Sequence, residues 1–306
     1  MATTKPKKTA KKSSTKTKAA VKSTRSVKTK KTSIKTASAV ATQTRVEKTN
    51  DNVGFFAKKF DATENILTIF KRKEIYGAIL GEVVGTMLIT VVLLTLGIYQ
   101  PLYIMLGMIG ITAMVFKLSG ANLNPLITVG MMATRRMSAI RGVLYIIAQV
   151  LGAWFALLIV NAFRTASGTS AELPVMSEVE SDMFWFVTLV EFFGSTIIGF
   201  TFARALQYKR KALAFATIVA SGIMVALIAA IVISGSFANL NNSFAMNPAV
   251  ALMYQILPTT GDNVGALLGD IALALVTYVI FPMLGGVIGF YISDLASFLT
   301  GEDTRM

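Results

Sequence analysis

Six long apolar stretches set the strongest limit on what this chain can fold into. A hydrocarbon core of ~30 Å is crossed by ~20 residues of α-helix. Stretches of about that length lie at residues 76–98, 102–118, 142–163, 184–203, 212–234 and 266–292. The 306 residues are 54% hydrophobic and 15% charged, with a mean hydropathy of +0.62, which is more apolar surface than a soluble domain of this size can bury. The sequence predicts an all-α membrane protein with six transmembrane helices.

The residue types that are missing narrow the function. The chain has no cysteine and no histidine, which excludes thiol nucleophiles, Cys/His metal sites and Ser-His arrangements. No set of nucleophile, base and orienting group is visible. We therefore expect no enzyme, no metal site and no cofactor.

The positive charge is concentrated at one end of the chain. Residues 1–73 carry 20 of the 30 Lys and Arg residues against four acidic residues, while the remaining chain has a net charge of −2. The segment is rich in Lys, Thr, Ser and Ala and has no apolar periodicity, so we expect a disordered tail. It is either a solvated extension or a contact for anionic lipid headgroups or nucleic acid.

The basic residues also predict an orientation. Cytoplasmic connections of membrane proteins are enriched in Lys and Arg. If the basic tail is inside, two connections between spans lie on the same side and are also positively charged. Their basic residues are Arg135, Arg136 and Arg141 in the first and Arg204, Lys209, Arg210 and Lys211 in the second. Among the predicted outer connections only Arg164 is basic. We expect a multi-pass protein of the cell (plasma) membrane with both termini in the cytoplasm.

Two Asn-Pro pairs interrupt the apolar pattern. Asn124-Pro125 lies in SGANLNPLITVG and Asn247-Pro248 in NSFAMNPAVALM. Asn is a favoured N-cap, and Pro suits the first helical position because its missing N–H costs nothing there. The pairs predict two half-helices, 124–133 and 247–257, the second closed by Pro258.

The chain also repeats itself. GEVVGT at 81–86 and VEFFGS at 190–195 each open a unit of three spans that contains one Asn-Pro pair. An odd number of spans turns the second unit upside down, and inverted repeats with broken helices point to a pathway near the bilayer midplane. We place repeat one at about 74–165 and repeat two at about 182–295, with the two half-helices meeting N-terminus to N-terminus.

Such a meeting has an electrostatic consequence. Two positive dipole ends would point at one place. If backbone N–H groups hold each Asn carboxamide oxygen, the NH₂ groups are left to donate into a lumen. That arrangement suits a neutral hydroxyl and repels cations and protons.

These motifs together resemble the aquaporin and glycerol-facilitator (major intrinsic protein) family. The residues that carry the resemblance are the two Glu-x-x-Gly motifs with SGANLNP at 119–125, AQVLGA at 148–153 and SFAMNPA at 243–249. It covers about residues 74–295, leaving 296–306 as a short cytoplasmic C-terminus. It implies six tilted helices plus two re-entrant half-helices, usually assembled as homotetramers with one pore per subunit. The motif residues are Asn124, Pro125, Leu126, Asn247, Pro248 and Ala249.

The resemblance also implies roles for polar residues inside the spans. Glu82 and Glu191 would accept hydrogen bonds from backbone N–H groups of the Asn-Pro loops, which we prefer to a proton relay. Gln149 is similarly interpreted as a polar contact between helices or, alternatively, as a pore-lining residue.

The narrowest part of the family's pore is formed by four positions. Carried over residue by residue, they fall on Ile104, Gly235, Phe244 and Val250. The family normally has Arg directly after Asn-Pro-Ala, where this chain has Val250, and Leu126 replaces the Ala of the first motif. Val supplies neither the charge nor the hydrogen-bond donors of Arg, so we expect a wider, drier and more permissive constriction.

The sequence thus predicts a passive channel for small uncharged solutes in the lipid bilayer. Glycerol or similar polyols, urea-like solutes and water are the candidates, and the glycerol-facilitator type fits FAMNPA best. The alternative is a non-conducting scaffold of the same fold whose basic tail binds a partner.

Overall fold

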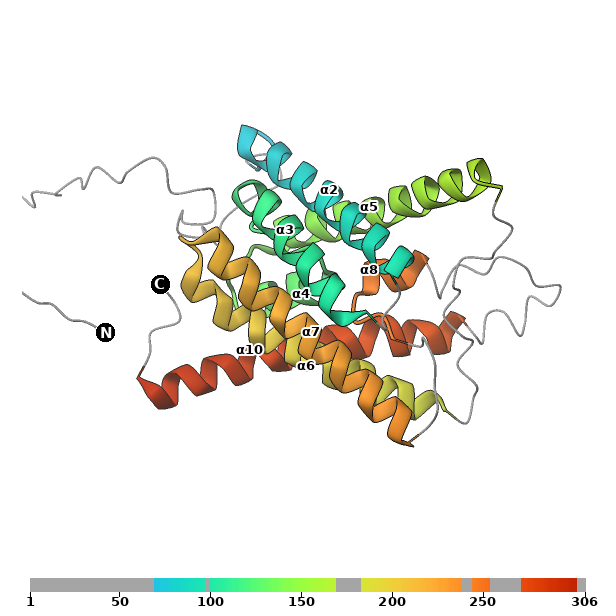
Figure 1. The fold of residues 1–306 in the computed structure, drawn as a ribbon. Helices are drawn as coiled ribbons and strands as arrows, with labels where there is room; N and C mark the ends of the chain where they lie inside the picture. The colour runs from blue at the N-terminus through green and yellow to red at the C-terminus, as the bar shows by residue number, and fades with distance from the viewer. Residues whose placement is uncertain (1–68, 97–99, 169–182, 238–243, 254–270, 302–306) are drawn as a thin grey trace, which may run out of the picture. The chain divides into compact units, whose positions relative to one another are not determined.

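The computed structural model describes residues 69–96, 100–168, 183–237, 244–253 and 271–301. The predicted disordered tail up to residue 68, Pro258 and the last five residues lie outside this part. Within it, six helices are long and apolar enough to cross a membrane (Figure 1), which confirms the predicted fold class. They are α2 (Lys73–Leu96), α3 (Pro101–Ser119), α5 (Ala139–Ala166), α6 (Phe184–Ala205), α7 (Ala212–Phe237) and a last one in which the π-helical turn η4 (Val276–Ile280) continues as α10 (Phe281–Thr300).

Two shorter helices begin at the prolines of the Asn-Pro pairs. They are α4 (Pro125–Ala133) and α8 (Pro248–Ala251). The nine residues of α4 are too few to cross a bilayer, because a span needs ~20 residues. The predicted remainder of the second half-helix falls after residue 253 and outside the described part. A 3₁₀ turn, η2 (Leu206–Tyr208), follows α6.

The helix contacts follow the internal repeat. The first and third long helices of each unit pack on each other, α2 on α5 and α6 on α10. Each short helix reaches across to the other unit, so that α4 contacts α10 and α8 contacts α5. The second long helices, α3 and α7, also pack together. Each half-helix is therefore held by the opposite repeat.

Glycine allows these pairs to approach closely. A Cβ on Gly152 of α5 would overlap the carbonyl oxygen of Val83 in α2, and a Cβ on Gly289 of α10 would overlap that of Thr196 in α6. The obstacle in both cases is backbone, which cannot move aside as a flexible side chain can. Small residues that let helix backbones meet are typical of membrane helix packing.

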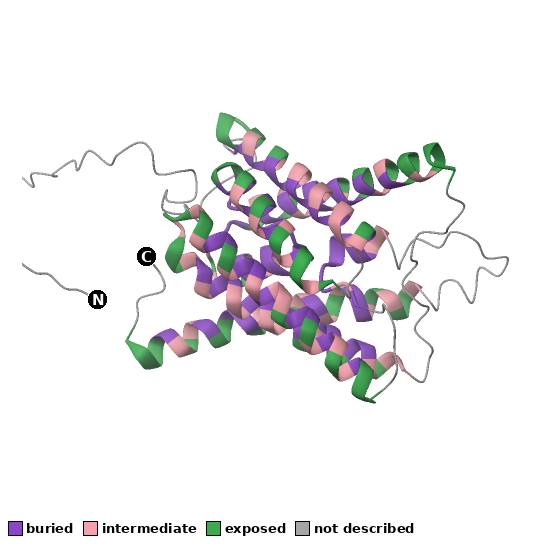
Figure 2. Cartoon of the chain, in the orientation of Figure 1, coloured by how far each residue is buried: buried purple, intermediate pink, exposed green. Residues whose placement is uncertain are grey.

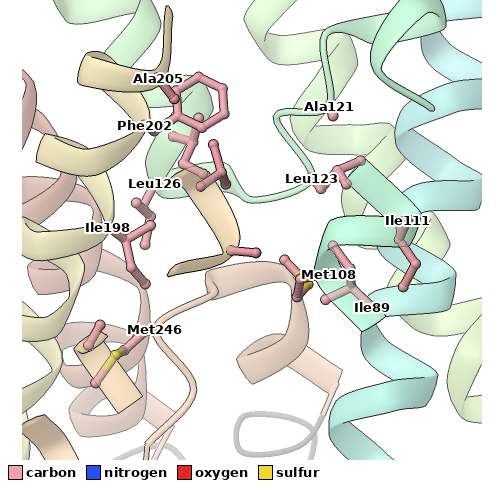
Figure 3. Packing of buried hydrophobic residues seen from close by; sticks show 14 of the residues in the cluster. Ile89, Met108, Ile111, Ala121, Leu123, Leu126, Ile198, Phe202, Ala205 and Met246 are labelled. Carbon is pink, nitrogen blue, oxygen red and sulfur yellow. The ribbon is translucent and has the colours of Figure 1, made fainter. Parts of the chain in front are cut away.

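Each long helix has a buried face and an exposed face. Buried residues lie on the helix faces that meet one another, and exposed residues lie on the other faces and at the ends (Figure 2). Large apolar side chains are exposed on the outer faces, among them Leu80, Leu106 and Val232. Lipid solvates such side chains, so their exposure is expected in a membrane protein. The buried cluster, with Met108, Leu123 and Ile198 among its members, fills the space between the helices (Figure 3).

A polar junction ties the end of α4 to α10. The guanidinium of Arg136 makes two bonds to Asp294, Nη2 to Oδ1 at 2.6 Å and Nη1 to Oδ2 at 3.1 Å. The same guanidinium lies 5.8 Å from the centre of the Phe290 ring. Tyr291 Oη donates to the carbonyl oxygen of Ala133 at 3.1 Å. Bidentate pairs of this kind fix geometry as well as adding stability, so the junction holds the segment after α4 against α10.

The glycine contacts lead to a stability prediction. Gly289→Ala places a methyl group against the backbone of α6, and overpacking costs about 1–3 kcal/mol. We expect a lower midpoint of thermal unfolding, measured by circular dichroism in detergent. Gly110→Ala is the matched control, because nothing lies within 4 Å of a Cβ at Gly110 in α3. It should keep or raise the midpoint, since Ala is favoured over Gly in a helix by about 0.5–1 kcal/mol. Equal midpoints for both variants would contradict the packing argument.

Candidate functional site

The two Asn-Pro pairs cap the short helices as helix N-termini require. Asn124 has an extended backbone with φ −156° and ψ 126°, and its Oδ1 accepts from Leu126 N at 3.1 Å. Asn247 has φ −149° and ψ 100°, and its Oδ1 accepts from Ala249 N at 3.1 Å. Pro125 occupies the first position of α4, where no N–H is needed. Both carboxamide oxygens are thus occupied, and both NH₂ groups face away from their own helix.

These NH₂ groups join the two loops crosswise. Asn124 Nδ2 donates to the carbonyl oxygen of Met246 at 2.8 Å, and Asn247 Nδ2 donates to that of Leu123 at 3.2 Å. Each bond spans more than 120 residues of sequence. Each carboxamide has two N–H donors, so one N–H of each Asn remains after this exchange. The structure therefore brings Asn124 and Asn247 to one place.

Buried carboxylates hold the backbone just before each Asn. Glu82 Oε1 accepts from Asn122 N at 3.0 Å and Oε2 from Leu123 N at 2.7 Å. Glu191 accepts from the backbone N–H groups of Ala245 and Met246. Backbone groups in the membrane interior have no water to bond, and each unsatisfied one costs several kcal/mol. The two carboxylates remove that cost at both loops.

Gln149 takes part in the first of these arrangements. It lies on α5 and is completely buried. Its Nε2 donates to Glu82 Oε2 at 2.7 Å and to Thr128 Oγ1 at 2.9 Å. The amide therefore links α5, α2 and α4, and it is not among the residues that line the cavity described below.

The residue before each Asn has a left-handed backbone. Leu123 has φ 55° and Met246 has φ 44°, a conformation that costs about 1–2 kcal/mol for a residue with a Cβ. It lets the N–H of that residue face a glutamate while its carbonyl faces the opposite Asn. A Cβ at Gly85 would overlap the Leu123 side chain, and a Cβ at Gly194 would overlap Met246. The Glu-x-x-Gly motif thus supplies both the acceptor and the space for this turn.

A cavity lies beside the paired asparagines. The space open to the centres of water molecules is about 40 Å³, which is room for roughly three waters at about 10–15 Å³ each. Its polar wall comes from the two loops, with residues 121–124 and 245–247. Its apolar wall includes two stripes at four-residue spacing, one on α3 and one on α7: Ile104, Met108, Thr112, Val219, Ile223 and Leu227. No charged side chain is among its described lining residues.

The four residues expected at the constriction do not all reach this cavity. Ile104 lines it and is completely buried. Phe244 and Val250 are 2% and 4% exposed and are outside its lining. Gly235 is exposed in the last turns of α7, with nothing within 4 Å of a Cβ built on it. The motif residues Leu126 and Ala249, in contrast, are fully buried, and their N–H groups donate to the capping asparagines.

Apart from Ile104, the sequence did not indicate the two helix stripes of the cavity wall. The α3 and α7 stripes have the four-residue spacing of one helix face, but in a span that is apolar all round this spacing does not stand out. Thr112 was a signal that could have been read, because it is a hydroxyl at the end of an otherwise apolar stripe.

Comparisons with known proteins agree on one family. The family model described as Major intrinsic protein matches residues 69–295. Aquaporin TIP1-2 of Musa acuminata is 32% identical over 165 residues, which are 52% of this chain and 62% of that protein. Probable aquaporin PIP2-1 of Oryza sativa subsp. japonica is 43% identical over 49 residues, which are 16% of this chain and 17% of that protein. The matches thus span less than two thirds of either relative.

One solved structure has a similar fold. The X-ray structure of the aquaglyceroporin from Plasmodium falciparum aligns with a TM-score of 0.52 over 72% of this chain and 99% of that chain. Its sequence is 18% identical, so the likeness concerns the fold.

The role of the buried carboxylates can be tested by stability. Glu191→Leu leaves the N–H groups of Ala245 and Met246 without their acceptor, and an unsatisfied buried donor costs about 1–3 kcal/mol. We expect a clear fall in the thermal unfolding midpoint in detergent. Glu191→Gln keeps one acceptor oxygen at the same position and should lose much less. A Gln variant as unstable as the Leu variant would show that the hydrogen bonds are not what stabilises this loop.

Proposed function

Since the chain belongs to the major intrinsic protein family, we propose that it forms a passive transmembrane channel for small uncharged solutes. Members of this family are channels and not enzymes, which confirms the expectation of no catalytic activity. The observation that carries the proposal is the crosswise pair of asparagines beside the cavity. Each retains one N–H that can donate to a passing oxygen atom.

The electrostatics of the described site favour neutral solutes. The N-terminus of α4 begins at the cavity, and helix N-termini carry a partial positive charge. Cations and protons are repelled by such a site. An anion would need a cationic side chain to offset its dehydration, and the described lining offers none. Passive flow of neutral molecules needs no cofactor and no coupling ion.

The proposed solutes are glycerol and similar polyols, with urea-like molecules and water as further candidates. The basis is the proposed constriction of Ile104, Gly235, Phe244 and Val250, which has no Arg. An apolar ring without fixed donors selects weakly by hydrogen bonding. Water is included because both curated relatives are named aquaporins.

We also propose that the protein is a homotetramer in the cell membrane. Both ends of its channel domain, about residues 74–295, would face the cytoplasm. Support for the orientation comes from the basic residues at the ends of the spans. Lys117 in the last turn of α3 and Arg204 in the last turn of α6 lie at span ends that the alternation of spans puts on the same side. Lys and Arg favour the cytoplasmic side.

Flux measurements test the proposal directly. Purified protein in proteoliposomes should accelerate the volume change that follows a glycerol gradient, and a water gradient, relative to bare lipid in a stopped-flow instrument. A preparation that is folded by circular dichroism yet moves water, glycerol and urea no faster than bare lipid would overturn the channel proposal. It would leave a non-conducting role for the fold.

The missing Arg leads to a second flux prediction. Val250→Arg adds volume and fixed donors at the proposed constriction, so we expect the glycerol permeability to fall relative to water by about tenfold, equivalent to about 1.4 kcal/mol. Val250→Met is the matched control for side-chain length without charge, and it should lower the ratio less. An unchanged ratio in the Arg variant would show that position 250 does not face the pathway.

A further inference from the structure

One corner of the helix bundle carries a cluster of basic side chains. Three residues, Lys209, Arg210 and Lys211, connect η2 to the start of α7. Arg210 and Lys211 are exposed, and Lys209 is partly buried. Lys117, in the last turn of α3, is exposed as well. We call these four residues the basic corner.

Aromatic packing brings the four residues to one place. The ring centres of Phe116 on α3 and Phe215 on α7 are 4.6 Å apart, and Phe202 on α6 lies 5.3 Å from Phe215. Phe116 directly precedes Lys117, and Phe215 N donates to the carbonyl oxygen of Lys211 at 2.9 Å. The ends of α3 and α6 and the start of α7 therefore meet at the basic corner.

No acidic residue balances the basic corner within the described part of the chain. That part contains four acidic residues, and none of them is in the last turn of α3 or α6, in the connection, or in the first turn of α7. They are Glu82 and Glu191, which hold the loops, Asp294, which bonds Arg136, and Glu74 in the first turn of α2.

The charges of the basic corner act on one another. Lys209 lies outside the spans, and its pKa is lowered, first by its partial burial and then by the charge of Arg210. The side chains of Lys117, Arg210 and Lys211 make no hydrogen bond or ion pair with the described residues. Like charges close together raise the energy of the folded state, and a nearby anion lowers it. The basic corner therefore gains stability from a negatively charged partner.

The surroundings of the basic corner indicate what kind of anion fits it. Three large side chains beside it are exposed, Leu118 by 45%, Tyr208 by 44% and Leu213 by 67%. Tyrosine is enriched where spans meet the lipid headgroups, and three of the long apolar helices begin or end here. A free anion would cover only the charges. A phospholipid covers the charges with its headgroup and the apolar side chains with its acyl chains.

We propose that the basic corner binds the headgroup of an anionic phospholipid. The phosphate accepts hydrogen bonds from Lys117, Arg210 and Lys211, and the acyl chains lie against Leu118 and Leu213. The N-terminal segment does not suit this surface, because residues 1–73 carry 20 basic and four acidic residues and have the same sign of charge. The inference concerns a surface that faces lipid, so it holds whichever solute the channel passes.

The test is a lipid titration of the purified full chain in detergent, with phosphatidylglycerol in one series and phosphatidylcholine in the other. The midpoint of thermal unfolding, followed by circular dichroism, gives an apparent dissociation constant, because a ligand that binds the folded state raises the midpoint. The variant combines Lys117→Gln, Arg210→Gln and Lys211→Gln. We expect its affinity for phosphatidylglycerol to fall about 10- to 100-fold, since each basic residue at an anionic surface contributes a factor of about five.

A matched control removes the same three charges elsewhere. Lys22→Gln, Arg25→Gln and Lys28→Gln act on the N-terminal segment and should keep the wild-type affinity for phosphatidylglycerol. In phosphatidylcholine alone, the corner variant should unfold at the wild-type midpoint or above it, because it has lost repulsion between like charges and no partner.

Four results would overturn the proposal. They are a corner variant with wild-type affinity for phosphatidylglycerol, a control variant that loses as much affinity as the corner variant, an equal response of the wild type to phosphatidylcholine, and an equal response to glycerol 3-phosphate. The last of these probes has the charged headgroup without acyl chains, so it would show a site for free anions. If the triple corner variant does not fold, the double variant Arg210→Gln and Lys211→Gln decides by the same comparison.

Discussion

Backbone hydrogen bonding in the middle of the bilayer is the constraint on which the rest of this structure depends. The two loops before α4 and α8 bring non-helical backbone to a depth where no lipid can satisfy it. Glu82 and Glu191 accept the N–H groups, and the opposite Asn side chains take up the carbonyls of Leu123 and Met246. A break in a membrane helix would otherwise be too costly. Here the break survives because these N–H groups and these two carbonyls have partners in the protein.

The inverted repeat explains why this solution appears twice. Each unit supplies a buried Glu, a Gly three residues later, a left-handed residue and a capping Asn. Neither unit is complete alone, because the carbonyl acceptor for each Asn side chain comes from the other unit. The units also differ, since Gln149 reinforces Glu82 and bonds Thr128 of α4. Each repeat thus supports the loop of the other. The same holds for the half-helices, because α4 packs on α10 and α8 packs on α5.

What the sequence could predict follows from how far each interaction reaches along the chain. The six spans and the N-caps are local patterns, and the predicted ends of the first five spans lie within three residues of the observed helix ends. The last helix ends at Thr300, eight residues beyond the predicted end at 292. The crosswise bonds of Asn124 and Asn247 join segments more than 120 residues apart, so only the repeat symmetry hinted at them. The left-handed backbone at Leu123 and Met246 had no signal, since neither is Gly. Gly235 was carried over residue by residue from the family's pore, and its place at the constriction stays a prediction.

In the proposed channel, the two walls of the cavity have different roles. The α3 and α7 stripes are mostly aliphatic and offer few hydrogen bonds to a polar solute. The solute is therefore not bound so tightly that it cannot leave. The loops offer donors and acceptors at fixed positions, which lowers the cost of removing water. Fixed groups need no rearrangement when a solute arrives, because the glutamates and caps have already set them. The rigidity needed to satisfy the broken backbone is therefore the same rigidity that presents the loops' polar groups to the cavity.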